Sequence, residues 1–237
     1  MAKEQFFLDV RRAATLVRPT VQTDSGQLTP EGVARRLQRA ALWLTPKCVG
    51  AYSPADFQDL PEPLQGNLTE VVKEFAEVAK NVPLDDSPSD VQFHEGLQRF
   101  NQLLSIVGEV VRNEWVSAVE RFVADSQSWS EKKGWPCQRR EKELHETLLD
   151  TYHLPQLYLS VAGSTLQLDP IARFVPGALG LVDFAILSPY RSMAIPRGAD
   201  GWHIHLELGK DIDSVQRQPW NEGTFLTATD VLLGRRQ

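Results

Sequence analysis

Apolar residues in the first half of the chain recur at helical spacing. One face of a predicted helix over residues 3–18 consists of apolar side chains: Phe6, Phe7, Val10, Ala13, Ala14 and Val17. Pro19 ends this helix. Further helices are predicted from Thr29, from Asn67 or Thr69, and from near Asp90. The last pattern continues to Trp129, and Gly134 is well placed as its left-handed C-terminal cap. This half is therefore predicted to be helical.

The pattern changes after Gly134, where apolar and polar positions begin to alternate. Turn-bounded segments predict about five strands: QLYLSV, TLQLDPIARFV, LVDFAIL, SMAIPR and WHIHLEL. Short links join them, whereas parallel neighbours need crossovers of about a dozen residues, so we expect antiparallel pairing. Residues 135–143 fit either a strand or a helix, and residues 144–152 are expected to form a short helix. The segment Pro219-Trp220-Asn221-Glu222 opens a final helix with Phe225, Ala228, Val231 and Leu232 buried.

These patterns together predict an α+β fold. A helical N-terminal half precedes an antiparallel β-meander, which is flanked by a long helix and a C-terminal helix. The boundary is expected near Gly108, which gives an all-helical domain over residues 1–107 and an α+β domain over residues 108–237. The segment IVGEVV around Gly108 fits either a continuous helix or a hinge.

Composition and charge narrow the functional classes. The chain has 237 residues, of which 42% are apolar and 24% charged, as in ordinary folded proteins. Its net charge of −6 gives no long-range attraction to phosphate, so nucleic acid is not an expected partner. The N-terminal segment resembles neither a secretory signal nor a membrane span. Cys48 and Cys137 lack metal-ligand spacing and are expected to be free thiols, so a cytoplasmic location is expected.

The segment Trp202–Leu208 carries the candidate chemistry. In a strand, Trp202, Ile204, Leu206 and Leu208 share one face, which is expected to be core, and the alternate residues His203, His205 and Glu207 share the other. Two imidazoles at this spacing can reach one metal ion, with Asp183 of a neighbouring strand as a third ligand. His203 and Glu207 lie roughly 13 Å apart along a strand, too far to share one ion easily. The same pattern also arises on any sheet with a solvated face.

Three functions are consistent with these residues. The first is a non-enzymatic interaction module that binds another protein and needs no cofactor, because no set of catalytic residue types stands at a recognisable spacing. The alternative is a metal-dependent phosphodiester hydrolase, nuclease-like, in which Asp183, His203 and His205 hold a divalent ion and Glu207 is a further catalytic candidate. The third is a small-molecule site in a cleft between the halves, lined by Trp202 and Tyr190.

Overall fold

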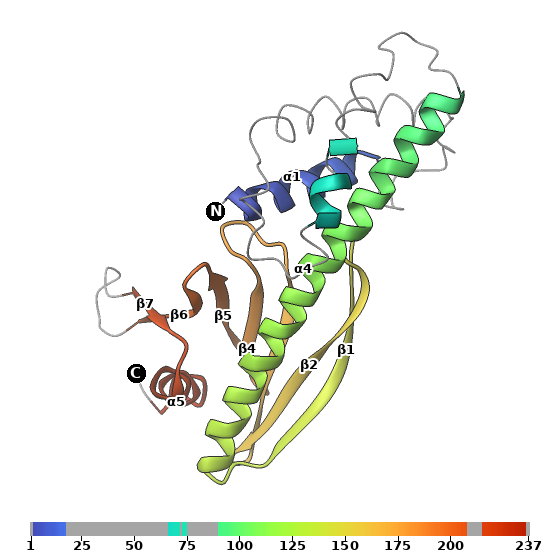
Figure 1. The fold of residues 1–237 in the computed structure, drawn as a ribbon. Coiled ribbons are helices and arrows are strands. Elements are labelled where there is room, and N and C mark those ends of the chain that lie inside the picture. The colour runs from blue at the N-terminus through green and yellow to red at the C-terminus, as the bar shows by residue number, and fades with distance from the viewer. Residues whose placement is uncertain (1, 18–65, 72, 75–89, 208–214, 236–237) are drawn as a thin grey trace. The chain divides into compact units, whose positions relative to one another are not determined.

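The computed structural model describes residues 2–17, 66–71, 73–74, 90–207 and 215–235. This part of the chain contains helix α1 (Ala2–Val17), the long helix α4 (Asp90–Lys132), a sheet, and helix α5 (Glu222–Leu232) (Figure 1). The strands are β1 (Cys137–Glu146), β2 (Asp150–Val161), β3 (Ser164–Ala172), β4 (Leu181–Leu187), β5 (Tyr190–Gly198), β6 (Gly201–Glu207) and β7 (Val215–Pro219). They form one sheet in sequence order, with antiparallel pairing from β2 through β7. The predicted α+β fold with an antiparallel meander, a long helix and a C-terminal helix is confirmed.

Two predictions of local structure differ from the structure. The short helix expected over residues 144–152 is wrong, because these residues form the end of β1, a turn and the start of β2. The sheet also contains β7, which the sequence pattern did not predict, and β1, over residues that the sequence left open between strand and helix. The helix expected after Thr29, and the part of the next helix beyond residue 74, lie outside the described residues.

Contacts divide the chain into two compact units. The first comprises residues 1–113 together with 145–150, and the second comprises residues 114–144 and 151–237. The division at Asn113 falls inside α4, which is one continuous helix and also runs through Gly108 without a break. Gly134, just after α4, has a φ of 70°, as expected for a left-handed cap.

The core of the first unit is formed by apolar helix faces. On α1, the predicted helical spacing is confirmed by fully or almost fully buried residues: Phe6, Phe7, Val10, Ala13 and Ala14. On the first half of α4, a matching stripe is buried: Phe100, Leu103, Leu104, Val107, Val110 and Val111. These stripes are typical of helices that pack on one side.

The sheet of the second unit has one apolar face, which we call the inner face. Its members are completely buried: Leu157, Leu159, Leu166, Leu168, Val182, Phe184, Ile195 and Ile204. Aromatic rings join this face to the helices. The ring centroids of Phe122 on α4 and Trp202 on β6 are 4.7 Å apart, and those of Phe184 and Phe225 on α5 are 5.7 Å apart. The second half of α4 and α5 therefore cover the inner face (Figure 1).

Helix α5 begins with a capping box. The backbone N–H of Thr224 donates to the Asn221 side chain at 3.1 Å, and the Asn221 N–H donates to the Thr224 hydroxyl at 2.9 Å. Two of the backbone donors at the start of the helix are thereby satisfied. Phe225, Ala228 and Leu232 are buried as predicted, but Thr229 is buried in place of Val231.

Candidate functional site

The opposite, outer face of the sheet carries a group of polar side chains on β1 to β4. Strand alternation places them there: Leu166 and Leu168 point to the inner face, so Gln167 and Asp169 point outward. We call the group the outer polar cluster; its members are Arg140, Lys142, Gln156, Tyr158, Gln167, Asp169 and Asp183. All except the exposed Arg140 are partly buried. Side chains at intermediate burial are held more firmly than freely solvated ones.

Asp169 on β3 lies at the centre of the outer polar cluster. The Lys142 ammonium on β1 donates to Asp169 Oδ1 at 2.7 Å and to the Pro170 carbonyl at 2.9 Å. The Gln156 amide on β2 donates to the same Oδ1 at 2.7 Å. The Lys142 and Asp169 side chains are 24% and 25% exposed, so their pair is screened less than a surface ion pair. One carboxylate therefore links three strands.

Tyr158 on β2 extends this network along the strands. The Gln167 amide donates to the Tyr158 hydroxyl at 3.0 Å, and that hydroxyl lies 3.5 Å from the Gln156 amide oxygen. The Arg140 guanidinium lies over the tyrosine ring, 4.6 Å from its centroid, in a cation–π arrangement. Neighbouring members thus restrict one another's rotamers.

Among the described residues, Asp183 on β4 is the carboxylate of the cluster for which no hydrogen bond or ion pair is found. It lies directly opposite Asp169 on one side and opposite Ala194 of β5 on the other. Across the described residues, its carboxylate makes no hydrogen bond and no ion pair. Partial burial and the neighbouring Asp169 charge raise the pKa of Asp183, and Lys142 offsets part of this effect. A carboxylate is therefore held beside another carboxylate without a cation of its own.

The histidines of β6 lie further along the outer face. His203 is only 7% exposed, whereas the sequence pattern suggested a solvated position. Its Nδ1 lies 3.1 Å from Arg217 Nη2, and its Nε2 lies 3.3 Å from Asp200 Oδ2. Since arginine can only donate, Nδ1 must accept and Nε2–H must face Asp200. His203 thus has both ring nitrogens engaged, while His205 is exposed.

Asp200 completes this second polar group. Arg217 Nη2 donates to Asp200 Oδ1 at 2.7 Å. Desolvation acts to raise the pKa of Asp200, but a backbone hydrogen bond and Arg217 together outweigh it and hold the pKa below its usual value. Asp200 therefore acts as the anionic partner of both Arg217 and His203.

The structure does not bring the proposed metal ligands into one group. In the described part of the chain, no three histidine, cysteine, aspartate or glutamate side chains are arranged to hold a metal ion. The charged neighbours of Asp183 are Asp169 and Lys142, whereas His203 contacts Asp200 and Arg217. Glu207 ends β6, and its side chain lies outside the description.

Trp202 and Tyr190 occupy different environments. Trp202 packs in the aromatic core, with its ring centroid 5.7 Å from that of Trp115. Tyr190 lies at the β4–β5 turn opposite Leu187, and it is 66% exposed. Trp202 is therefore a packing residue, and Tyr190 is a surface residue.

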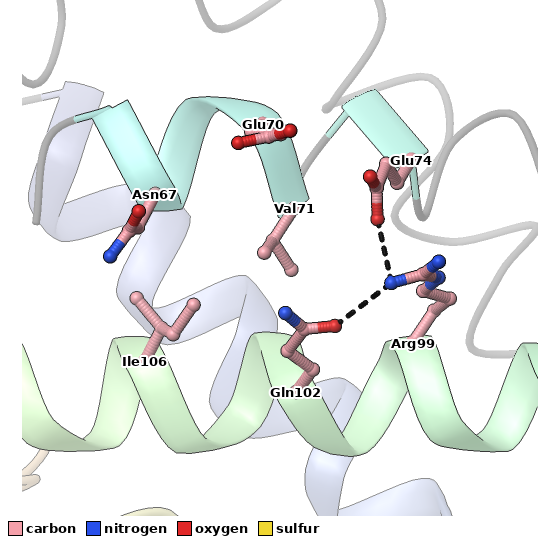
Figure 2. A pocket seen from close by; sticks show the side chains of 7 residues that line it. All are labelled: Asn67, Glu70, Val71, Glu74, Arg99, Gln102 and Ile106. Atoms are coloured by element: carbon pink, nitrogen blue, oxygen red, sulfur yellow. Dashed lines mark hydrogen bonds and ion pairs between the residues drawn. The ribbon is translucent and has the colours of Figure 1, made fainter.

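A cavity of about 270 Å³ lies in the first unit, between residues 67–74 and α4 (Figure 2). Arg99 Nη1 lies 2.8 Å from Glu74 Oε2 and 3.2 Å from Gln102 Oε1, so the guanidinium in its wall is already bound. Val71 and Ile106 add apolar surface to the lining. None of the residues predicted from the sequence as functional lines this cavity.

Sequence reasoning missed Lys142, Gln156 and Asp169. The signal for Asp169 was present, because Leu166 and Leu168 are buried on one face of β3 and the residues that alternate with them, Gln167 and Asp169, lie on the other face. Lys142 lies in the charged segment QRREKELHE, which is compatible with an exposed helix or with an edge strand and so did not single out any residue. Searches of protein-family models, curated proteins and solved structures found no match.

Proposed function

We propose that the chain is a non-enzymatic protein-interaction module, and that the outer polar cluster is its contact surface. The observation that carries the proposal is the Asp183 carboxylate, which lies opposite Asp169 in a hydrogen-bonded network but has no hydrogen bond or ion pair of its own within the described part of the chain. A carboxylate in such a place raises the free energy of the folded protein, because it is partly desolvated beside a like charge. Residues of this kind are found where binding rather than stability determines their identity.

The chemistry of the cluster favours a cationic group on the partner. The donors of Lys142 and Gln156 are both directed to Asp169 Oδ1, which leaves Asp169 Oδ2 and the Asp183 carboxylate as acceptors. An arginine side chain offers five donors and no acceptor, in a planar arrangement that suits carboxylates. Ala194, which lies opposite Asp183 on β5, has only a methyl side chain. We therefore propose an arginine or lysine side chain of another protein as the bound group.

The metal-dependent hydrolase has less support. Binding of a metal by His203 would require its nitrogens to leave Arg217 or Asp200. Asp183 is opposite Ala194 and Asp169, neither of which is an imidazole ligand. No observation in the second unit favours a catalytic reaction over binding.

The proposal is tested with short peptides that differ only in a central arginine, lysine, glutamine or glutamate. Calorimetric titration is expected to give the tightest binding for arginine, followed by lysine. Asp183→Asn is expected to weaken binding of the arginine peptide about tenfold, because a charge-assisted hydrogen bond is lost.

Asp125→Asn is the matched control, since Asp125 is an exposed carboxylate on α4. It is expected to bind the arginine peptide as the wild-type protein does. Equal affinities for the arginine and glutamate peptides, or equal losses in the two variants, would show that the outer polar cluster is not the contact surface.

A further inference from the structure

The turn between β1 and β2 is unusual in its burial. Leu148 and Leu149 in this turn are 3% and 0% exposed, whereas turn residues normally lie at the surface. The Leu149 N–H donates to the Glu146 carbonyl at 3.0 Å, which closes the turn. Asp150 follows with a φ of 56°, in the left-handed region. The hairpin therefore ends in an apolar, well-packed tip.

This tip packs directly against α4. A Cβ atom at Gly108 would overlap the Leu148 carbonyl oxygen, so the absence of a side chain at Gly108 permits the close approach. One turn further along α4, Arg112 Nη1 donates to the Leu149 carbonyl oxygen at 3.3 Å. Glycine inside a helix is unfavourable relative to alanine, and this contact accounts for its presence. The tip is thus held by a close backbone contact and a hydrogen bond.

The same two strands hold the outer polar cluster in order. Lys142 on β1 and Gln156 on β2 both bind Asp169. Residues 145–150 group with the first unit, while the remainder of both strands groups with the second. The hairpin is therefore shared covalently by the two units.

We infer that docking of the β1–β2 tip on α4 regulates the outer polar cluster; this inference rests on the proposed function. With the tip docked, β1 and β2 hold Lys142 and Gln156 against Asp169, so that Asp183 remains available to a cationic group. Release of the tip loosens both strands and lowers the affinity for that group. The opening and closing of the β1–β2 tip is thus a local equilibrium that is coupled to binding of the cationic group.

Arg112→Ala tests this inference, and Arg121→Ala is the matched control, because Arg121 is an exposed arginine on the same helix. Loss of the Arg112 hydrogen bond is expected to raise the rate of hydrogen exchange at the backbone amides of Lys142 and Gln156 about fivefold. It is also expected to lower the affinity for the arginine peptide by a similar factor. The control is expected to change neither quantity. Gly108→Ala, which displaces the Leu148 carbonyl, is expected to act in the same direction as Arg112→Ala.

The two readouts separate this inference from the proposed function. If the wild-type protein does not bind the arginine peptide, the proposed function is wrong, and exchange at Lys142 and Gln156 alone decides whether the tip orders the strands. If exchange increases only within residues 145–150, or increases along the strands without any loss of affinity, the inferred regulation is wrong.

Discussion

At the scale of single residues, the outer face of the sheet is distinguished by the environment of the Asp183 carboxylate. Its carboxylate is partly desolvated, lies opposite Asp169, and has no partner among the described residues. Each of these conditions disfavours the charged form. The nearby Lys142 ammonium is directed to Asp169 and compensates Asp183 only at a distance. The charged form of Asp183 therefore makes the folded protein less stable at neutral pH.

Replacement of this carboxylate by an amide is expected to stabilise the protein. Because the pKa of Asp183 is raised above 3.8 by folding, the folded state binds more protons than the unfolded state just above that pH. Stability consequently falls as pH rises through this interval. Asp183→Asn is expected to raise the free energy of unfolding at pH 7 by roughly 0.5 kcal/mol, a value reduced for solvent screening. Denaturant unfolding at several pH values measures the effect.

The pH profile provides the control for this prediction. The difference between Asp183→Asn and the wild-type protein is expected to shrink below pH 3.8, where the carboxyl is protonated in both states. A destabilised Asp183→Asn variant at pH 7 would mean that the carboxylate makes a stabilising interaction, and would contradict this account.

Strand alternation identified Asp183 as an outward-facing residue, but its surroundings could not be predicted. The sequence suggested His203 and His205 as its companions, whereas the cross-strand neighbour is Asp169. The neighbours of Asp183 depend on the order of strands in the sheet, in which β5 separates β4 from β6. The sequence pattern of one strand contains no information about side chains two strands away.

At the scale of elements, the predictable ones were those with clear apolar periodicity. The inner-face leucines of β2 and β3 and the stripe on α4 show strict spacing, and these elements were predicted. Strand β1 has the burial pattern of a largely exposed element and contains mostly charged residues. Charged residues are common on edge strands, where they discourage pairing with other chains. Its strand character depends on pairing with β2, which the local sequence does not reveal.

The β1–β2 turn is an element for which the local sequence pattern gave a wrong prediction. The local sequence over residues 144–152 is compatible with a short helix, which the structure does not contain. In the structure, Leu148 and Leu149 lie in a turn and are buried, and their backbone carbonyls contact Gly108 and Arg112 of α4. Burial that comes from a distant element cannot be read from local spacing.

The capping box of α5 gives a prediction at this scale. Asn221→Ala removes the side-chain acceptor for the Thr224 N–H and is expected to destabilise the protein by about 1 kcal/mol. Asn221→Ser keeps a side-chain acceptor and is expected to destabilise the protein much less. Thermal or denaturant unfolding distinguishes the two variants, and equal losses would show that the cap does not stabilise α5.

At the scale of the whole molecule, the second unit uses the two faces of its sheet differently. The inner face is covered by α4 and α5 and holds the apolar and aromatic core. The outer face holds polar side chains that hydrogen-bond to one another. The chain has a net charge of −6, which favours approach of a basic partner. None of the helices that the structure describes is long and apolar enough to cross a membrane.

The central claim is that Asp183 receives a cationic group from a protein partner, and the most direct test is an NMR titration of its carboxyl carbon. In the free protein, the pKa of Asp183 is expected above its ordinary value of 3.8. With saturating arginine peptide it is expected to fall, because a bound guanidinium stabilises the charged form. A pKa of Asp183 that stays unchanged while the peptide shifts signals elsewhere in the protein would contradict the account.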